Sequence, residues 1–301
     1  MNYSAKLSTK AAFDRYEEVR ARLPSAAFPY TSTHCANLSE VAAHVDAFVL
    51  DAFGVLNVGN TPIPGAVNRI AELRELGKQV VVLTNAASDD HAFAIAKFEA
   101  LGFDFSGDEI VTSRDVCVEH IRQTHPNGRW GAVCKATDTL ADIDLDIIAW
   151  TGDLQADVDG FLLLSSEQID DPLMTRLEIA LNERKRPVIC ANPDIVAPRE
   201  TGLSCEPGFY THALADRIGI VPEFFGKPFG NAFKAASHQL SGLSVDRIAM
   251  VGDTLHTDVL GGAAAGMKTV LIENHGLFKG HDVESYMTTS GIRPDIICPT
   301  T

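Results

Sequence analysis

Six polar side chains in this sequence stand where chemistry is commonly found, either just after an apolar run or on a tight turn. They are Asp51, Thr84, Asn85, Lys227, Asp253 and Asp258. In an open parallel sheet, ligands bind at the carboxyl ends of the strands. Each residue alone could serve a turn or a helix cap. Their order along the chain and their placement after strands together favour one shared site.

The residue types in this set fit phosphoryl transfer. Three carboxylates at one edge of a sheet repel one another and raise their own pKa values unless positive charge lies among them. Lys227 and a hard divalent cation would supply that charge, and Mg²⁺ accepts carboxylate and phosphate oxygens together. Both cations would shield the negative charge of a phosphate, so that the Asp51 carboxylate could approach and attack it. Thr84 and nearby backbone N–H groups would hold the remaining phosphoryl oxygens.

The surrounding residues predict the elements that position this set. From residue 41 onward, short apolar runs alternate with helical segments, which is typical of an α/β fold with a doubly wound parallel sheet. The expected strands of the sheet are 47–50, 79–83, 110–111, 248–251 and 269–272. The expected helices are 65–76, 89–101, one after residue 111, and 258–265.

Residues 127–205 differ in texture and predict a smaller α/β cap domain inserted into a core made of 41–126 and 206–301. The expected elements of the insert are strands 131–134, 160–164 and 188–191 and a helix at 172–183. Residues 1–40 are predicted to be a helical N-terminal extension. Its apolar side chains recur at helical spacing before Pro24 and predict a helix packed on the main body. These side chains are Ala12, Phe13, Tyr16, Val19 and Leu23.

The composition narrows the range of partners. Lys plus Arg number 25 against 40 Asp plus Glu, and the net charge of -15 repels nucleic-acid phosphates and anionic lipids. We therefore expect neither nucleic acid nor membrane as a partner. The sequence has no signal peptide and no run of about 18 apolar residues. Its six cysteines form no CxxC pair, which favours free thiols in the cytoplasm.

The six residues lie in four segments, 51–56, 84–85, 226–228 and 252–258. These segments resemble, in order, the four motifs of the haloacid dehalogenase (HAD) superfamily. An insert after the second motif, with Asn192-Pro193-Asp194 inside it, is similar to subclass IIA, the NagD-like and p-nitrophenylphosphatase-like hydrolases with a C2 cap. The resemblance implies a Mg²⁺-dependent phosphatase acting on a small phosphorylated metabolite, such as a sugar phosphate or nucleotide. It leaves a homodimer open.

The resemblance also implies individual roles. Asp51 is the expected nucleophile, assisted by Lys227 and Thr84. The metal ligands would be Asp51, the backbone carbonyl of Phe53, Asp253 and Asp258. Phosphate or substrate contacts are expected from Phe53, Gly54, Asn85, Asn192 and Asp194. His256, inside the fourth motif, is expected beside the site rather than in it.

One position departs from the phosphatase pattern. The residue two after the nucleophile is normally an aspartate that protonates the leaving group, and here it is Phe53. General acid catalysis contributes about 10²- to 10⁴-fold, so alkyl phosphates would react slowly unless another group substitutes. This leaves three alternatives open: a dehalogenase-like enzyme, a hydrolase of acyl phosphates or phosphoanhydrides, and a catalytically weak protein that binds a phosphorylated ligand.

Overall fold

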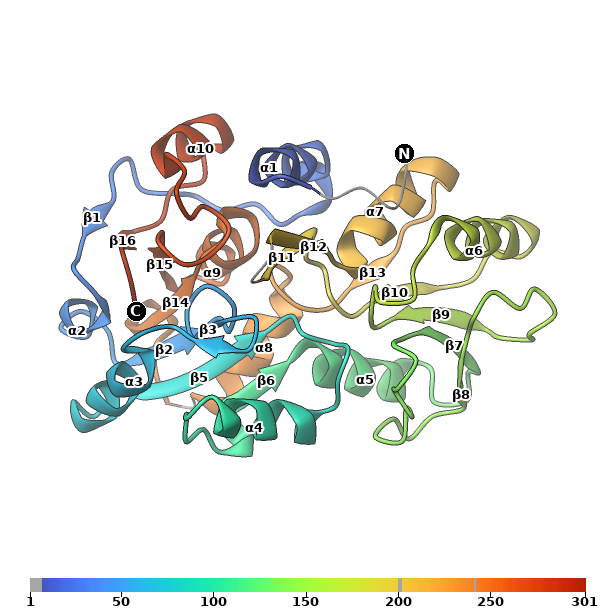
Figure 1. Cartoon of the computed structure of the whole chain (residues 1–301), viewed down its shortest axis with the longest axis horizontal. Coiled ribbons are helices and arrows are strands. Elements are labelled where there is room, and N and C mark those ends of the chain that lie inside the picture. Colours follow the sequence, from blue (N-terminus) through green and yellow to red (C-terminus); the bar gives the residue numbers. More distant parts are fainter. Residues whose placement is uncertain (1–6, 200–201, 241) are drawn as a thin grey trace.

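The computed structural model describes residues 7–199, 202–240 and 242–301 of the chain. The first six residues of the predicted N-terminal extension lie outside these ranges. The main sheet has seven parallel strands in the order β1-β16-β15-β14-β2-β5-β6, which matches the predicted doubly wound α/β class (Figure 1). The strands are β1 (Thr33–His34), β2 (Ala47–Leu50), β5 (Gln79–Thr84), β6 (Ile110–Thr112), β14 (Ile248–Gly252), β15 (Lys268–Ile272) and β16 (Ile296–Cys298).

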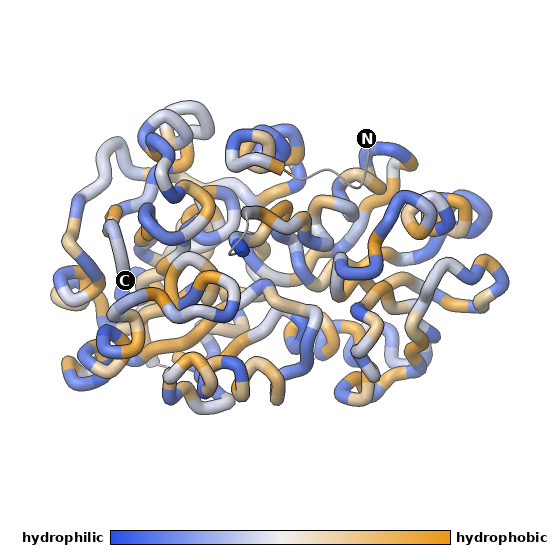
Figure 2. Tube along the Cα trace, viewed as in Figure 1, coloured by the Kyte–Doolittle hydropathy of each residue, from blue (hydrophilic) through white to orange (hydrophobic). Residues whose placement is uncertain are grey.

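Alternating side chains of the central strands supply two separate apolar layers. Phe48 and Leu50 of β2 face a cluster that includes side chains of helices α2 (Leu38–Val41), α3 (Ala66–Glu75) and α4 (His91–Ala100). Ala47 and Val49 face the opposite cluster with α8 (Gly230–Gln239). The period of two is that of a strand buried on both faces. Figure 2 shows the central strands as apolar and the helices as mixed in hydropathy.

A second sheet forms the cap, with five parallel strands in the order β13-β10-β9-β7-β8. These strands are β7 (Trp130–Val133), β8 (Ile147–Ala149), β9 (Gly160–Leu163), β10 (Val188–Cys190) and β13 (Glu223–Phe224). Helices α6 (Asp171–Glu183) and α7 (Pro207–Ile218) cover one face. The other face packs on α5 (Ser113–Thr124), and Trp130 and Trp150 are buried. Because β13 pairs with β10, this sheet continues beyond residue 205, where the insert was predicted to end.

Two antiparallel pairs of strands are separate from the two large sheets. The first, β3 (Asn57–Val58) with β4 (Thr61–Pro62), follows β2. The second, β11 (Val196–Arg199) with β12 (Gly202–Cys205), belongs to the insert and lies between the two sheets in Figure 1. After β14 the chain forms a π-helical segment, Leu255–Val259, before α9 (Leu260–Ala264). The predicted single helix at 258–265 is therefore two elements.

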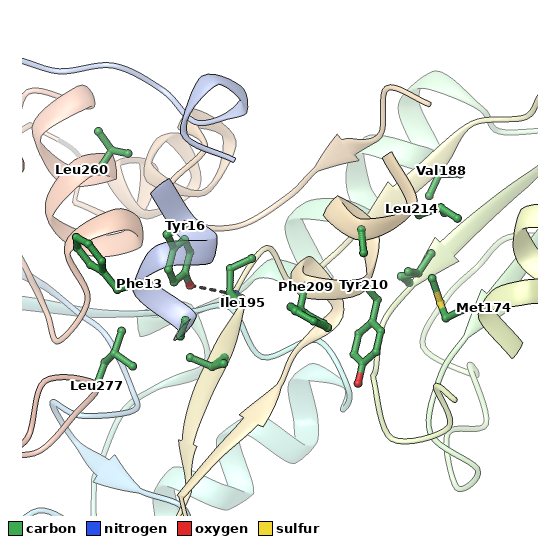
Figure 3. Close-up of a cluster of buried hydrophobic side chains, with 14 of the residues drawn as sticks. Phe13, Tyr16, Met174, Val188, Ile195, Phe209, Tyr210, Leu214, Leu260 and Leu277 are labelled. Carbon is green, nitrogen blue, oxygen red and sulfur yellow. Dashed lines mark hydrogen bonds between the residues drawn. The ribbon is translucent and has the colours of Figure 1, made fainter. Parts of the chain in front are cut away.

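The N-terminal extension forms a helix, α1 (Thr9–Glu18), as its apolar spacing predicts. Figure 3 shows Phe13 and Tyr16 of α1 between Leu277 of the core and Ile195 of the insert. The backbone N–H of Ile195 donates to the Tyr16 hydroxyl at 3.0 Å. The guanidinium of Arg15 binds Asp216 of α7 at 2.5 Å. Helix α1 thus contacts both the core and the cap.

Beyond α1, the extension also supplies β1, which pairs with β16 at one edge of the main sheet. Neither strand is among those expected from the sequence. The last helix, α10 (Val283–Ser290), lies next to α1 in Figure 1. Among the residues the structure describes, no helix is long and apolar enough to cross a membrane. The six cysteines, all within the described residues, form no disulfide, and four of them are buried.

Candidate active site

The predicted strand-end residues meet at the carboxyl edge of the main sheet. The Lys227 Nζ atom lies 2.5 Å from Asp51 Oδ1 and 2.8 Å from Asp258 Oδ1. The side chain of Lys227 is 2% exposed, that of Asp258 1% and that of Asp51 13%. Because these side chains are buried, the charged Lys227 needs both carboxylates as partners. An unpaired buried charge would cost much free energy of folding.

Three carboxylates surround a point that could hold a metal ion. One oxygen each from Asp51, Asp253 and Asp258 lies within 4.8 Å of the others. Burial, together with repulsion from Asp258, raises the pKa of Asp51 to about 7 against the opposing effect of Lys227. Burial, then Asp258 and Asp51, raise the pKa of Asp253 to about 8. A cluster of hard oxygen donors with this unbalanced negative charge fits a divalent cation such as Mg²⁺.

Close backbone approach fixes the third carboxylate. A Cβ atom on Gly54 would lie 2.6 Å from Asp253 Cβ, and the φ angle of Gly54 is +77°. A Cβ atom on Gly276 would lie 1.8 Å from Asp253 Oδ2. The backbone N–H of Leu277 donates to this same Oδ2 at 2.6 Å. Gly54, a predicted phosphate contact, is therefore seen packing against Asp253, and the role of the 276–277 backbone was missed because it leaves no side-chain signal.

Asn85 links the second motif to the lysine loop and to the cap. Its side-chain oxygen Oδ1 accepts a hydrogen bond from the Lys227 backbone N–H at 2.7 Å, and its Nδ2 donates to the Lys227 backbone carbonyl at 2.9 Å. The same Nδ2 donates to Asp194 Oδ1 at 2.8 Å. Burial, with a further contribution from Asp51, raises the pKa of Asp194 well above its usual range although Lys227 opposes this. The predicted substrate contact Asn85 thus positions two other predicted residues.

A cleft of about 420 Å³ opens above these groups, between the main sheet and the insert. Seven predicted residues line it: Asp51, Phe53, Thr84, Asn85, Asn192, Asp194 and Asp253. Lys227 and Asp258 lie buried beneath it. Six further charged residues line the cleft and were not predicted: Asp89, Lys97, Lys135, Glu167, Arg199 and Glu206. They come from helices, loops and the insert, where a single sequence gives no indication of side-chain direction.

His256 points away from the cleft. Its Nε2 lies 2.5 Å from Glu17 Oε1, and its ring stacks on Tyr16 with centroids 4.9 Å apart. The ring is fully buried against α1. His256 therefore holds the N-terminal helix to the fourth motif, in keeping with its predicted place outside the site.

Comparisons with known proteins agree with this geometry. Residues 48–143 match the family described as haloacid dehalogenase-like hydrolase, and residues 224–300 match the HAD-hydrolase-like family. The acid sugar phosphatase of Staphylococcus epidermidis is 27% identical over 248 residues, which is 80% of this chain and 91% of that protein.

Two solved structures are similar over most of their length. A possible sugar phosphatase of the HAD superfamily from Cytophaga hutchinsonii superposes with a TM-score of 0.78 and 26% identity, covering 91% of this chain and 98% of that one. The p-nitrophenyl phosphatase from Archaeoglobus fulgidus gives 0.71 and 26%, covering 85% and 96%. The two matched ranges together span more than half of the chain, which belongs to the HAD superfamily of hydrolases, and its structural neighbours include sugar phosphatase and p-nitrophenyl phosphatase members of subclass IIA.

Proposed function

We propose that this protein is a Mg²⁺-dependent phosphatase that hydrolyses a small phosphorylated metabolite through an aspartyl-phosphate at Asp51. The observation that carries the proposal is the pairing of Lys227 with Asp51 and Asp258, with Asp253 alongside, beneath a cleft at the carboxyl edge of the sheet. The names of the relatives, which act on sugar phosphates and p-nitrophenyl phosphate, support a phosphate monoester as substrate.

In the first step an Asp51 oxygen attacks phosphorus. A new O–P bond forms, the bond to the leaving oxygen breaks, and the leaving group departs with the electron pair. In the second step water attacks the phosphorus of the aspartyl-phosphate, which releases phosphate and restores the Asp51 carboxylate. Thr84, at the end of β5, holds phosphoryl oxygens through its hydroxyl and the backbone that follows it.

Lys227 carries permanent positive charge in this scheme. Burial alone would lower its pKa, but the carboxylates of Asp258, Asp51 and Asp194 raise it well above the usual value. The ammonium group therefore stays protonated and offsets charge on the phosphoryl oxygens. Asp258 keeps it in place, and the Thr254 backbone N–H donates to the other Asp258 oxygen at 3.0 Å.

The residues that would hold Mg²⁺ are Asp51, Asp253, Asp258 and the Phe53 carbonyl. When bound, the ion neutralises phosphate charge and offsets the repulsion among the carboxylates.

A second candidate substrate class is favoured by Phe53. Acyl phosphates and phosphoanhydrides release leaving groups that are stable as anions, and these need no proton donor. Both classes use the same nucleophile, so they are variants of one chemistry. A cytoplasmic location also remains a prediction.

The nucleophile can be tested by the Asp51→Asn substitution, which keeps the shape of the side chain but removes its negative charge. Turnover of p-nitrophenyl phosphate should fall at least about 10³-fold with the circular dichroism spectrum unchanged. The matched control Asp108→Asn, at an exposed position outside the cleft, should retain wild-type turnover. Near-native activity in the Asp51 variant would rule out the covalent route.

A further inference from the structure

A second group of cations lies in the same cleft, apart from Lys227. Lys97 is on α4 of the core, Lys135 follows β7 of the insert, and Arg199 ends β11. These three cations come from three separate elements and line the cleft together with the carboxylates of Asp89, Glu167 and Glu206. Nothing in the phosphoryl-transfer scheme uses them.

Two of these cations lie against the ring of Phe53. Lys97 Nζ is 4.5 Å from the ring centroid and Arg199 Cζ is 5.1 Å from it. The face of an aromatic ring is electronegative and attracts such groups. Phe53, Lys97 and Arg199 line the cleft that opens above Asp51, where the part of the substrate beyond its phosphate would lie. The cations it gathers therefore border the leaving-group side of the cleft.

Arg199 is held in a fixed orientation. Its Nη2 donates to Glu206 Oε1 at 2.9 Å and its Nε donates to Ser204 Oγ at 2.9 Å. Ser204 Oγ in turn donates to Glu206 at 2.6 Å, and Asn192 Nδ2 donates to the other Glu206 oxygen at 3.2 Å. The buried Glu206 carboxylate is thus engaged on both oxygens, and the guanidinium plane is set at the wall of the cleft.

Lys135, like Arg199, lies between a carboxylate and an aromatic ring. Its ammonium group pairs with Asp89 and lies 5.2 Å from the ring of Phe93, which is 52% exposed. Lys97 of the core and Arg199 of the insert thus lie against the ring of Phe53. Lys135 of the insert lies against the ring of Phe93 on α4. A neutral sugar offers nothing that matches paired cations, whereas a carboxylate or phosphate does.

We infer that the leaving group of the substrate carries a second anionic group, a carboxylate or a second phosphate, which is bound by Lys97 and Arg199 beside the Phe53 ring. The inference rests on the proposed phosphatase function and narrows its substrate class. Lys97 and Arg199 are the specificity-determining residues.

The test compares three probes that share one leaving-group framework: phenyl phosphate, 4-carboxyphenyl phosphate and 1,4-phenylene bisphosphate, the last corrected for its two equivalent phosphates. The ratio of kcat/KM for an anionic probe to that for phenyl phosphate should be at least about 10 in the wild type, chiefly through KM. Preference for the carboxylate probe identifies a carboxylate, and preference for the bisphosphate identifies a second phosphate.

The same ratio is then measured in Lys97→Met, Arg199→Met and Arg199→Lys. The two methionine variants should bring it close to one, and Arg199→Lys should restore part of it. Lys279→Met, at an exposed site outside the cleft, should keep the wild-type ratio. Because each variant is referred to its own phenyl phosphate rate, a general loss of activity cancels.

A wild-type ratio near one, or a ratio unchanged in the methionine variants, would overturn the inference while leaving the phosphatase proposal intact. If no aryl phosphate were turned over at all, the phosphatase proposal would fail instead. The anion preference would then be judged from the dissociation constants of the same three probes, measured by calorimetry in the presence of Mg²⁺. Equal affinity for all three would reject it.

Discussion

Phe53 stands where the resemblance to phosphatases implies a proton-donating aspartate, and its ring cannot donate a proton. The leaving oxygen must then depart with its negative charge or receive a proton from elsewhere. Asp194 is the side chain best suited to that task, because it lines the cleft and its pKa is raised well above the usual range, chiefly by burial. His256 is excluded by its contacts with Glu17 and Tyr16.

If no residue substitutes for the missing acid, the rate should depend steeply on the pKa of the leaving group. We expect kcat/KM to rise by orders of magnitude from alkyl phosphates to nitro-substituted aryl phosphates, because general acid catalysis matters most for poor leaving groups. The measurement is a substituted aryl phosphate series plus one alkyl phosphate. A flat dependence with chemistry rate-limiting would contradict this, and Asp194→Asn would then be expected to make it steep.

Metal removal acts on the carboxylate cluster. Chelator should abolish hydrolysis of p-nitrophenyl phosphate and Mg²⁺ should restore it, because Asp51, Asp253 and Asp258 repel one another without a cation. Asp253→Asn should raise the Mg²⁺ concentration needed for half-maximal activity. Full activity of thoroughly metal-free protein would refute the assignment, and wild-type Mg²⁺ dependence in the Asp253 variant would remove that residue from it.

The predictable part of the site consists of residues tied to strand ends. Asp51, Thr84 and Asp253 were found from sequence because apolar runs locate strands and parallel strands share one carboxyl edge. Lys97, Arg199 and Glu206 were not, because their place in the cleft depends on how the insert packs over the core. Backbone donors such as the Leu277 N–H carry no residue-type signal at all.

At the scale of elements, a buried hydrogen bond from the Ile195 backbone N–H to the Tyr16 hydroxyl joins α1 to the insert. Tyr16→Phe should lower the free energy of unfolding by about 1–3 kcal/mol, since it leaves the Ile195 N–H without its acceptor. Chemical denaturation measures the change. The control Tyr30→Phe alters a fully exposed ring and should change stability by less than about 0.5 kcal/mol. Equal effects from both substitutions would mean that the hydrogen bond contributes nothing.

Helix α7 carries a histidine that should make the protein sensitive to acid. Burial, with added repulsion from Arg22 and Arg15, lowers the pKa of His212 to about 3. The folded state therefore keeps the ring neutral, while the unfolded chain binds a proton near pH 6.5. Stability from this group is complete above about pH 6.5 and is lost as the pH falls toward 3, by up to about 1.4 kcal/mol per pH unit.

His212→Phe should flatten this acid dependence, because it removes the titrating ring while keeping a ring that can stack on Phe224, whose centroid lies 4.5 Å away. Unfolding free energies measured between pH 4 and 8 provide the comparison. The exposed His44, changed to Phe as a control, should leave the slope as in the wild type. An unchanged slope in the His212 variant would mean that other groups cause the acid sensitivity.

Elements with strong periodicity were predicted closely, and short ones were not. The expected strand 47–50 is β2, and the expected helix 172–183 differs from α6 by one residue. The strands β1, β13 and β16 are two or three residues long and too short to show a period. Their pairing is set by the neighbouring strands, which a short run of residues does not reveal.

At the scale of the whole molecule, core and insert share a continuous apolar cluster. Phe13 and Tyr16 of α1 belong to the same cluster as Leu277 and Phe278 of the core and Phe209 of α7 (Figure 3). Residues of the insert and of the main sheet line the cleft from opposite sides. The shared apolar cluster therefore joins the two parts of the protein that form the cleft. Any opening of the insert must separate part of this cluster or move α1 with it.

The position of α1 also affects the biosynthesis of the protein. This helix leaves the ribosome before its docking partners exist, because Thr9 Oγ1 donates to the Leu277 carbonyl and the Phe13 ring packs on Tyr286. A free helix of ten residues is marginal in water. Part of the apolar face of α1 therefore stays uncovered until residues 277–286 have been translated.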